Sequence, residues 1–325
     1  MILFYILLFI ASIFSLGWSG SRLVKYLMKI ARFLNWREFV VAFFIMAVAG
    51  SFPNLFIGIN SALHNIPQLS FGDIVGGNIV DLTLAISAAV LIGGVNLPAK
   101  SRLVQRSAIF TAVIAVLPVL LILDKELSRI DGLILILTFL VFIFWLFSKS
   151  ERFKKIYDKE AELRKEKLPF FVKVKEFFKD LTLVFLSLSL LLLGSEGIII
   201  SAQVFGNFLQ MSLPLVGMLI VGLGNALPET YFAVVSAKKK NNWLILGDLM
   251  GAVIVCATLI LGIVAIITPI KILNFSTFAI ARIFLFISAI FFLIVVRTGQ
   301  RITKKEGVLL LLIYILFFAG EVIFK

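Results

Sequence analysis

The chain has 325 residues, of which 61% are hydrophobic, and its mean hydropathy is +1.10. A soluble domain is about 45–50% apolar, so this composition excludes a soluble globular protein and indicates an integral membrane protein. The net charge of +13 does not indicate nucleic-acid binding, because the basic residues are scattered over short loops without a recognition pattern. With one cysteine and one histidine, a disulfide framework and a histidine-based metal site are also excluded.

Ten apolar stretches follow one another along the chain, each near or above the ~20 residues that a helix needs to cross a bilayer. They cover residues 2–21, 38–64, 71–94, 107–123, 132–148, 180–202, 211–237, 244–268, 275–296 and 305–323. The second and the seventh are long and contain a proline, so we expect each to consist of two half-helices joined by a break. The sequence therefore predicts an all-α membrane protein with ten transmembrane helices.

The positive charges lie mainly on one side of these predicted spans. Of the 31 Lys and Arg residues, 26 fall in the loops after the odd-numbered spans, and four fall on the other side. This asymmetry predicts a cell-membrane protein with cytoplasmic basic loops and both termini outside. The Lys- and Glu-rich segment 149–179 is then a cytoplasmic linker. It separates a first five-helix unit, residues 1–148, from a second, residues 180–325.

Two pairs of matching segments relate these units. AGSFPNLFIGINSA and GDIVGGNIVDLTL, which begin at Ala49 and Gly72, recur as GNALPETYFAVVSA and GDLMGAVIVCATL 175 positions later, with ten identities in 27 positions. Because five is an odd number of helices, the second copy enters the membrane in the opposite direction. Such inverted-topology repeats are a common plan of secondary transporters.

Few ionisable residues lie inside the predicted spans, and an acid at that depth indicates function because it is costly to insert. Glu229 follows Pro228, where the expected helix break frees backbone carbonyls, and Asn54 holds the matching place in the first repeat. Asp81 and Cys256 form the second matching pair. Each repeat thus supplies one carboxylate, and the two together balance one divalent cation.

Calcium takes six to eight oxygen ligands, which carboxylates, amides and freed carbonyls can supply, whereas a thiol suits it poorly. The predicted cation-site residues are Glu229, Asp81, Asn54, Ser51, Asn225, Asn78 and Cys256, with Glu229, Asp81 and Asn54 as metal ligands. Asp73 and Asp248 are interpreted instead as caps at helix starts. Glu196 and Arg282 can pair with each other or with solvent at the membrane rim, and the pattern does not distinguish these alternatives.

GSFPN and GNALPE, each followed by GDxxGxxI, resemble the two alpha repeats of the sodium/calcium exchanger family, whose typical motifs are G-T-S-x-P-E and G-N-x-x-G-S-N. The resemblance spans all ten helices. It implies a central cation site made by helices 2, 3, 7 and 8, and electrogenic antiport by alternating access. The chain departs from the family pattern at Asn54 and Cys256, where acids are expected, and at Asp81, where Asn is common. Of the family's hydroxyl groups for sodium, only Ser51 remains.

The leading hypothesis is a secondary active antiporter that exchanges Ca²⁺ or a related cation for Na⁺. One alternative is a cation/proton antiporter, since a carboxylate shielded from water, such as Glu229 or Asp81, can carry a proton near neutral pH. Another is a membrane protein that keeps the exchanger fold without transport. An enzyme is disfavoured because the spans hold no nucleophile–base pair. The expected partners are inorganic cations and the lipid bilayer, without nucleic acid or a cofactor, for a monomeric protein.

Overall fold

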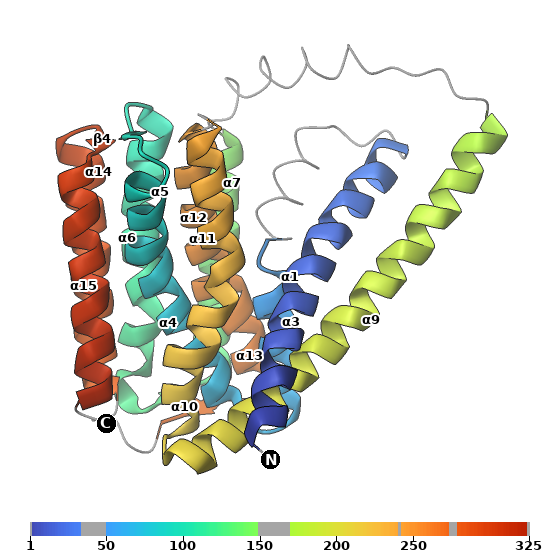
Figure 1. Cartoon of the computed structure of the whole chain (residues 1–325), viewed down its shortest axis with the longest axis horizontal. Coiled ribbons are helices and arrows are strands. Elements are labelled where there is room, and N and C mark those ends of the chain that lie inside the picture. Colours follow the sequence, from blue (N-terminus) through green and yellow to red (C-terminus); the bar gives the residue numbers. More distant parts are fainter. Residues whose placement is uncertain (1, 34–49, 149–169, 240–241, 273–277, 324–325) are drawn as a thin grey trace.

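The computed structural model describes residues 2–33, 50–148, 170–239, 242–272 and 278–323 (Figure 1). In the first half the elements are α1 (Ile2–Phe33), α3 (Phe52–Leu63), α4 (Pro67–Val80), the π-helical segment η1 (Asp81–Ala85), α5 (Ile86–Leu91), β1 (Leu97–Pro98), α6 (Arg102–Leu121), the 3₁₀ turn η2 (Ile122–Asp124), β2 (Glu126–Leu127) and α7 (Arg129–Ser148).

The second half consists of α9 (Phe170–Leu209), α10 (Leu213–Val216), the π-helical segment η5 (Gly217–Val221), α11 (Gly222–Lys238), α12 (Asn242–Val255), the π-helical segment η6 (Cys256–Ile260), α13 (Leu261–Ile267), β3 (Ile270–Lys271), α14 (Ala279–Thr298), β4 (Arg301–Ile302) and α15 (Lys304–Ile323). Among the described residues, nine helices are long and apolar enough to cross a membrane. They match nine of the ten predicted spans. The remaining one, 38–64, contains α3, and its residues 38–49 lie outside the described part of the chain.

The 175-residue repeat is visible in the backbone. Helix α4 (67–80) and helix α12 (242–255) have bounds that differ by 175 at both ends, and so do η1 (81–85) and η6 (256–260). Each repeat thus changes from α-helical to π-helical hydrogen bonding at the matching residue. Within otherwise regular helices, such π-bulges occur frequently at functional sites. Two short antiparallel pairings, β1 with β4 and β2 with β3, join the first repeat to the second.

The two prolines act differently from each other. Helix α3 begins at Phe52 with Pro53 in its first turn, where proline is well tolerated. Helix α11, in contrast, continues through Pro228, so the expected division of the seventh span into two half-helices at this proline is wrong. A proline inside a membrane helix removes one backbone hydrogen bond, which the surrounding structure can compensate without ending the helix. The irregularity in this span is the π-helical segment η5, which lies before Pro228 in the chain.

Glycines allow α4 to touch the segment formed by α10 and η5. A Cβ atom at Gly72 would lie 2.0 Å from the carbonyl oxygen of Pro214, and one at Gly76 would lie 2.2 Å from that of Met218. Gly217 approaches the carbonyl oxygen of Leu69 equally closely, since its Cβ would lie 2.3 Å away. Small residues on both sides therefore bring the two backbones into direct contact, as is common between membrane helices. This contact fixes the position of α4 relative to α11.

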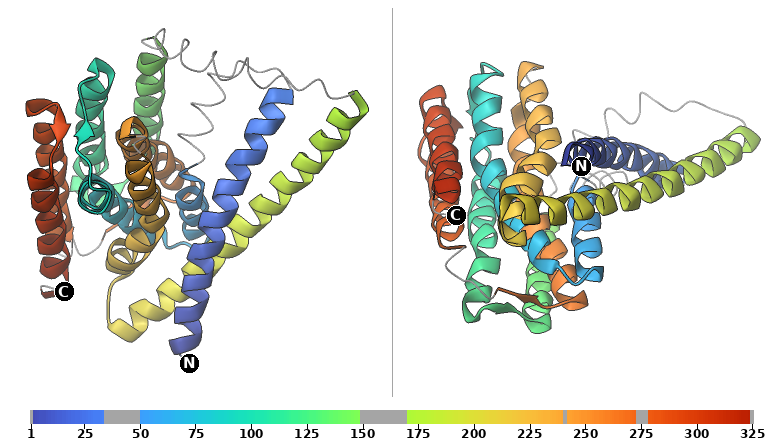
Figure 2. Two further views of the ribbon diagram at one scale, coloured as in Figure 1. Left: turned by 45° about the horizontal axis from the view of Figure 1, so that its top comes forward. Right: turned by 60° about the horizontal axis from the view of Figure 1, so that its bottom comes forward.

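Helices α1 and α9 form a separate part of the bundle. They pack along each other around a hydrophobic cluster that includes Leu16, Leu23, Leu191 and Ile198. The two long helices lie to one side of the remaining helices (Figures 1 and 2), and α9 contacts α3 and α10. Helix α9 begins at Phe170, so residues 170–179 of the predicted linker are helical. The division of the chain into 1–148, 149–179 and 180–325 stays a prediction.

Candidate cation site

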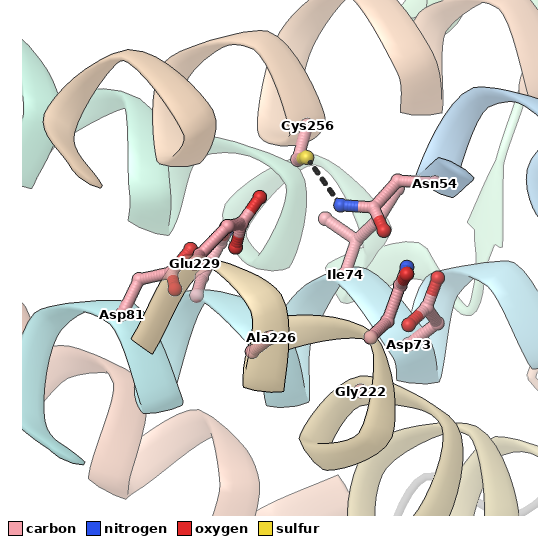
Figure 3. Close-up of a pocket in the computed structure, with 11 residues that line it drawn as sticks. Asn54, Asp73, Ile74, Asp81, Gly222, Ala226, Glu229 and Cys256 are labelled. Atoms are coloured by element: carbon pink, nitrogen blue, oxygen red, sulfur yellow. Dashed lines mark hydrogen bonds between the residues drawn. The ribbon is translucent and has the colours of Figure 1, made fainter. Parts of the chain in front are cut away.

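A small buried cavity lies where α3, α4, η1, α11 and η6 meet (Figure 3). The cavity has a volume of about 10 Å³, which is close to the minimum that holds one water molecule. Its walls are formed by Asn54, Asp73, Ile74, Gly77, Asn78, Asp81, Gly222, Asn225, Ala226, Glu229 and Cys256. Both repeats therefore contribute polar side chains to one small, largely enclosed space.

Two carboxylates from different repeats approach each other at one side of this cavity. Asp81 is the first residue of η1 and is 3% exposed, and Glu229 follows Pro228 on α11. The two side chains are close enough to interact directly, and Oδ1 of Asp81 has no hydrogen-bond partner. Two like charges facing each other in a low-dielectric interior are unfavourable unless a cation or a proton lies between them. This arrangement is suited to attract a cation.

A neutral pair faces the cavity from another side. Nδ2 of Asn54 donates a hydrogen bond to Sγ of Cys256 over 2.9 Å, which joins α3 to η6. With its nitrogen engaged in this way, the amide of Asn54 has its carbonyl oxygen turned away from Cys256 (Figure 3). The hydroxyl of Ser51 is buried without a hydrogen-bond partner, and Ser51 does not line the cavity. The positions at which the family pattern has acids thus form a hydrogen-bonded, uncharged contact.

Two further amides complete the polar wall. Asn78 lies on α4 and is 2% exposed, while Asn225 lies on α11, one turn before Glu229. The nitrogen Nδ2 of Asn225 is buried without a hydrogen-bond partner. Six of the seven residues predicted for the cation site therefore surround one cavity, and Ser51 lies just outside it. Their role as ligands stays a prediction.

The sequence pattern predicts that Asp73 caps a helix start, and this prediction is wrong. Helix α4 begins at Pro67, so Asp73 lies in its second turn, where it is 2% exposed and lines the cavity. Asp248 likewise lies inside α12 rather than at its start, and it is near enough to act electrostatically on Asp81 and Glu229. The spacing of Asp73, Gly77 and Asp81 at four-residue intervals was the signal that could have placed Asp73 on the same helix face as Asp81.

Carboxylates alone do not form a complete metal site in this structure. Within the described part of the chain, no group of three His, Cys, Asp or Glu side chains is arranged so that it could hold a metal ion. An ion at Asp81 and Glu229 would therefore need oxygens from amides, backbone or water as well. Hard cations such as calcium readily accept such mixed oxygen ligands.

Glu196 has partners away from the cavity. Its Oε1 lies 3.1 Å from Nε2 of His64, and Nδ2 of Asn60 donates to its Oε2 over 3.3 Å. These contacts join the end of α3 to α9. Arg282 donates from Nε to the carbonyl oxygen of Phe278 over 3.2 Å. Glu196 therefore belongs to a contact between helices and not to the candidate cation site.

A bundle of membrane helices in which two repeats each supply a carboxylate to one central cavity is typical of a secondary transporter. The family described as "Sodium/calcium exchanger protein" matches residues 4–148 and 179–321. The chain belongs to this family, and it is a multi-pass membrane protein and a cation antiporter.

Individual relatives match over nearly the whole chain. Inner membrane protein YrbG of Escherichia coli (strain K12) is 25% identical over 312 residues, which cover 93% of this chain and 92% of that protein. Sodium/calcium exchanger MaX1 of Methanosarcina acetivorans is 25% identical over 347 aligned positions, which cover 90% and 91%. A solved structure of the sodium-calcium exchanger NCX_Mj has a TM-score of 0.63 at 20% identity, covering 98% of this chain and 99% of that one. That similarity supports the ten-helix fold.

Proposed function

We propose that this antiporter exchanges Ca²⁺, or a related divalent cation, for Na⁺ by alternating access. The observation that carries the proposal is the pair formed by Asp81 and Glu229, which come from different repeats and interact with each other at one side of the cavity. Their combined charge of −2 balances one divalent cation. Because each carboxylate belongs to its own repeat, a movement of one repeat against the other would open and close the ligand set.

The neutral groups support calcium as the bound ion. Glu229, Asp81 and Asn54 are proposed as metal ligands, with Asn78 and Asn225 as further oxygen donors from the cavity wall. Two carboxylates and three amide carbonyls offer about seven oxygens, within the six to eight that calcium prefers. In this proposal Cys256 orients Asn54 through its hydrogen bond and binds the ion only weakly, since sulfur suits a hard cation poorly. Ser51, just outside the cavity, is proposed as a further neutral ligand. The relative MaX1 carries the name of a sodium/calcium exchanger.

A cation/proton antiporter is the second candidate, and one observation favours it. None of the residues that line the cavity carries a hydroxyl group, although the family pattern uses hydroxyls for sodium. A carboxylate of the Asp81–Glu229 pair could carry the proton in that case. The proposal of sodium as counter-ion therefore requires that carboxylate and amide oxygens replace those hydroxyls.

The wider setting of the protein is part of the same proposal. The distribution of Lys and Arg supports an orientation with both termini outside and the linker 149–179 in the cytoplasm. We expect a monomer that works in the cell membrane without a resident cofactor and without enzymatic activity. The transported ions are the cargo, and the gradient of one ion supplies the free energy to move the other.

The test is ⁴⁵Ca²⁺ uptake into proteoliposomes that contain the purified protein, driven in parallel by an outward Na⁺ gradient or by a pH gradient. We expect uptake with the Na⁺ gradient, its loss in Glu229→Gln, and wild-type uptake in the control variant Glu126→Gln. Glu126 pairs with Lys271 over 3.6 Å, away from the cavity. Its substitution by Gln therefore removes one carboxylate without changing the candidate site. Uptake driven only by the pH gradient would support the proton alternative, and no uptake with either gradient would support loss of transport.

A further inference from the structure

Asp73 is a buried acid that lines the cavity but is not among the proposed ligands of the divalent cation. It is 2% exposed, and its Oδ2 has no hydrogen-bond partner. The ion pairs found in the described part of the chain lie elsewhere, and no Lys, Arg or His lines the cavity. A buried carboxylate with an unsatisfied oxygen and no cationic side chain beside it in the cavity is costly, so its presence inside a membrane protein points to an ion that it binds.

The position of Asp73 separates it from the Asp81–Glu229 pair. Asp73 and Asp81 are eight residues apart on the helix formed by α4 and η1, which corresponds to about 12 Å along the helix axis. Two ligands of one calcium ion lie at 2.3–2.6 Å from it, so their oxygens are at most about 5 Å apart. Figure 3 shows Asp73 on the opposite side of the cavity from Asp81 and Glu229. One ion cannot bind to Asp73 and Asp81 at the same time.

Asn225 is the natural second ligand beside Asp73. Its side chain faces the carboxylate of Asp73 from α11 and interacts with it, although its buried Nδ2 makes no hydrogen bond of normal geometry. A cation beside Asp73 would replace this weak contact, and a rotation of the amide would then turn its carbonyl oxygen toward the ion. Gly222 of α11 would place a Cβ atom 2.8 Å from the carbonyl oxygen of Asp73, so the two backbones are held in close contact at this point. The two side chains therefore lie on rigidly joined helices.

We propose that Asp73 and Asn225 form a second cation position, distinct from the Asp81–Glu229 pair, which binds the monovalent counter-cation. One carboxylate with a charge of −1 balances one Na⁺, as the paired carboxylates balance one divalent ion. This inference rests on the proposed exchange of Ca²⁺ for Na⁺. In this inference the two ions bind at opposite ends of one cavity. An acid, Asp73, and an amide, Asn225, take the place of the hydroxyl groups that the family pattern uses for sodium.

The test measures Na⁺ binding and transport separately in purified full-length protein. The variants are Asp73→Asn, which keeps the shape of the side chain, and Asn225→Ala, with Glu126→Gln as the control for loss of a carboxylate. Equilibrium binding of ²²Na⁺ without calcium is compared with ⁴⁵Ca²⁺ binding without sodium. Size-exclusion chromatography of each variant confirms that it is folded.

We expect Asp73→Asn to weaken ²²Na⁺ binding about 10- to 100-fold, the range seen when a supporting group of a metal site is removed. Asn225→Ala should weaken it in the same direction, while ⁴⁵Ca²⁺ binding changes by less than about threefold in Asp73→Asn. The inference is overturned if wild type binds no ²²Na⁺, if both variants bind it like wild type, or if Asp73→Asn loses Ca²⁺ binding as well. If the variants lose ²²Na⁺ binding but a Na⁺ gradient drives no ⁴⁵Ca²⁺ uptake, the second position stands and the proposed exchange is wrong.

Discussion

Replacing Gly76 by alanine should separate the two helices that form the cavity. The added Cβ would lie 2.2 Å from the carbonyl oxygen of Met218 and 2.8 Å from its Cα and carbonyl carbon, whereas ordinary contact needs at least 3.4 Å. These neighbours are backbone atoms and cannot rotate away, so α4 and η5 must move apart by about 1.2 Å, the difference between the two oxygen distances. Overpacking of this kind costs about 1–3 kcal/mol.

Gly77→Ala is the matched control, because its Cβ would meet nothing closer than the carbonyl oxygen of Gly222 at 4.0 Å. Alanine is better than glycine in a helix by about 1 kcal/mol, and this gain applies equally to both variants. The difference in stability between the two variants therefore isolates the overpacking at Gly76. We expect Gly76→Ala to be about 1–3 kcal/mol less stable than Gly77→Ala.

The assay is thermal unfolding in detergent, followed by the loss of the monodisperse peak in size-exclusion chromatography. Gly76→Ala should melt below wild type, and Gly77→Ala at the wild-type temperature or above it. Gly76→Ala should also transport more slowly, because it moves Asp81 away from Glu229. Equal melting temperatures for the two variants would refute the reasoning that backbone contact at Gly76 holds α4 against η5.

Three further predictions concern single side chains. Glu229→Gln should weaken Ca²⁺ binding by about 2–5 kcal/mol, because it removes one of the two carboxylate charges that face each other at the cavity; a calorimetric titration with an unchanged Kd would contradict this role. Cys256→Ser should make ⁴⁵Ca²⁺ uptake less sensitive to Cd²⁺, a soft cation that prefers thiolate, and equal inhibition of both proteins would show that Cd²⁺ does not reach the thiol. His64→Ala should lower stability by no more than about 1 kcal/mol, since the side chains of His64 and Glu196 are 40% and 39% exposed. Its Ca²⁺ affinity should match wild type, and a loss of affinity would connect this contact to the site.

The fold could be predicted from the sequence largely because the repeat is visible in the residues. A fixed offset of 175 anticipated the matching bounds of α4 and α12 and of η1 and η6. The sequence could not predict in the same way that the helix continues through Pro228. Whether a proline ends a helix depends on the groups that surround it, and these come from distant parts of the chain.

The sequence predicts which residues gather at the candidate site, but it does not predict the contacts that these residues make with one another. The sequence alone shows that Asp81 is an acid where the family pattern often has Asn, and that Cys256 stands where that pattern has an acid. The hydrogen bond between Asn54 and Cys256 joins residues 202 positions apart and depends on how α3 packs against η6. Asp73 was misinterpreted because the start of α4 was placed at residue 71, whereas the helix begins at Pro67. An error of one turn at a helix start was enough to turn a residue of the cavity into a cap.

The central claim is that one divalent cation binds between the two carboxylates contributed by the two repeats. Anomalous diffraction from crystals of the protein grown with Sr²⁺ or Mn²⁺ tests this claim most directly. We predict one strong anomalous peak between Asp81 and Glu229, which disappears in crystals of Glu229→Gln. A peak at another position, or no peak in this cavity at saturating cation, would contradict the account.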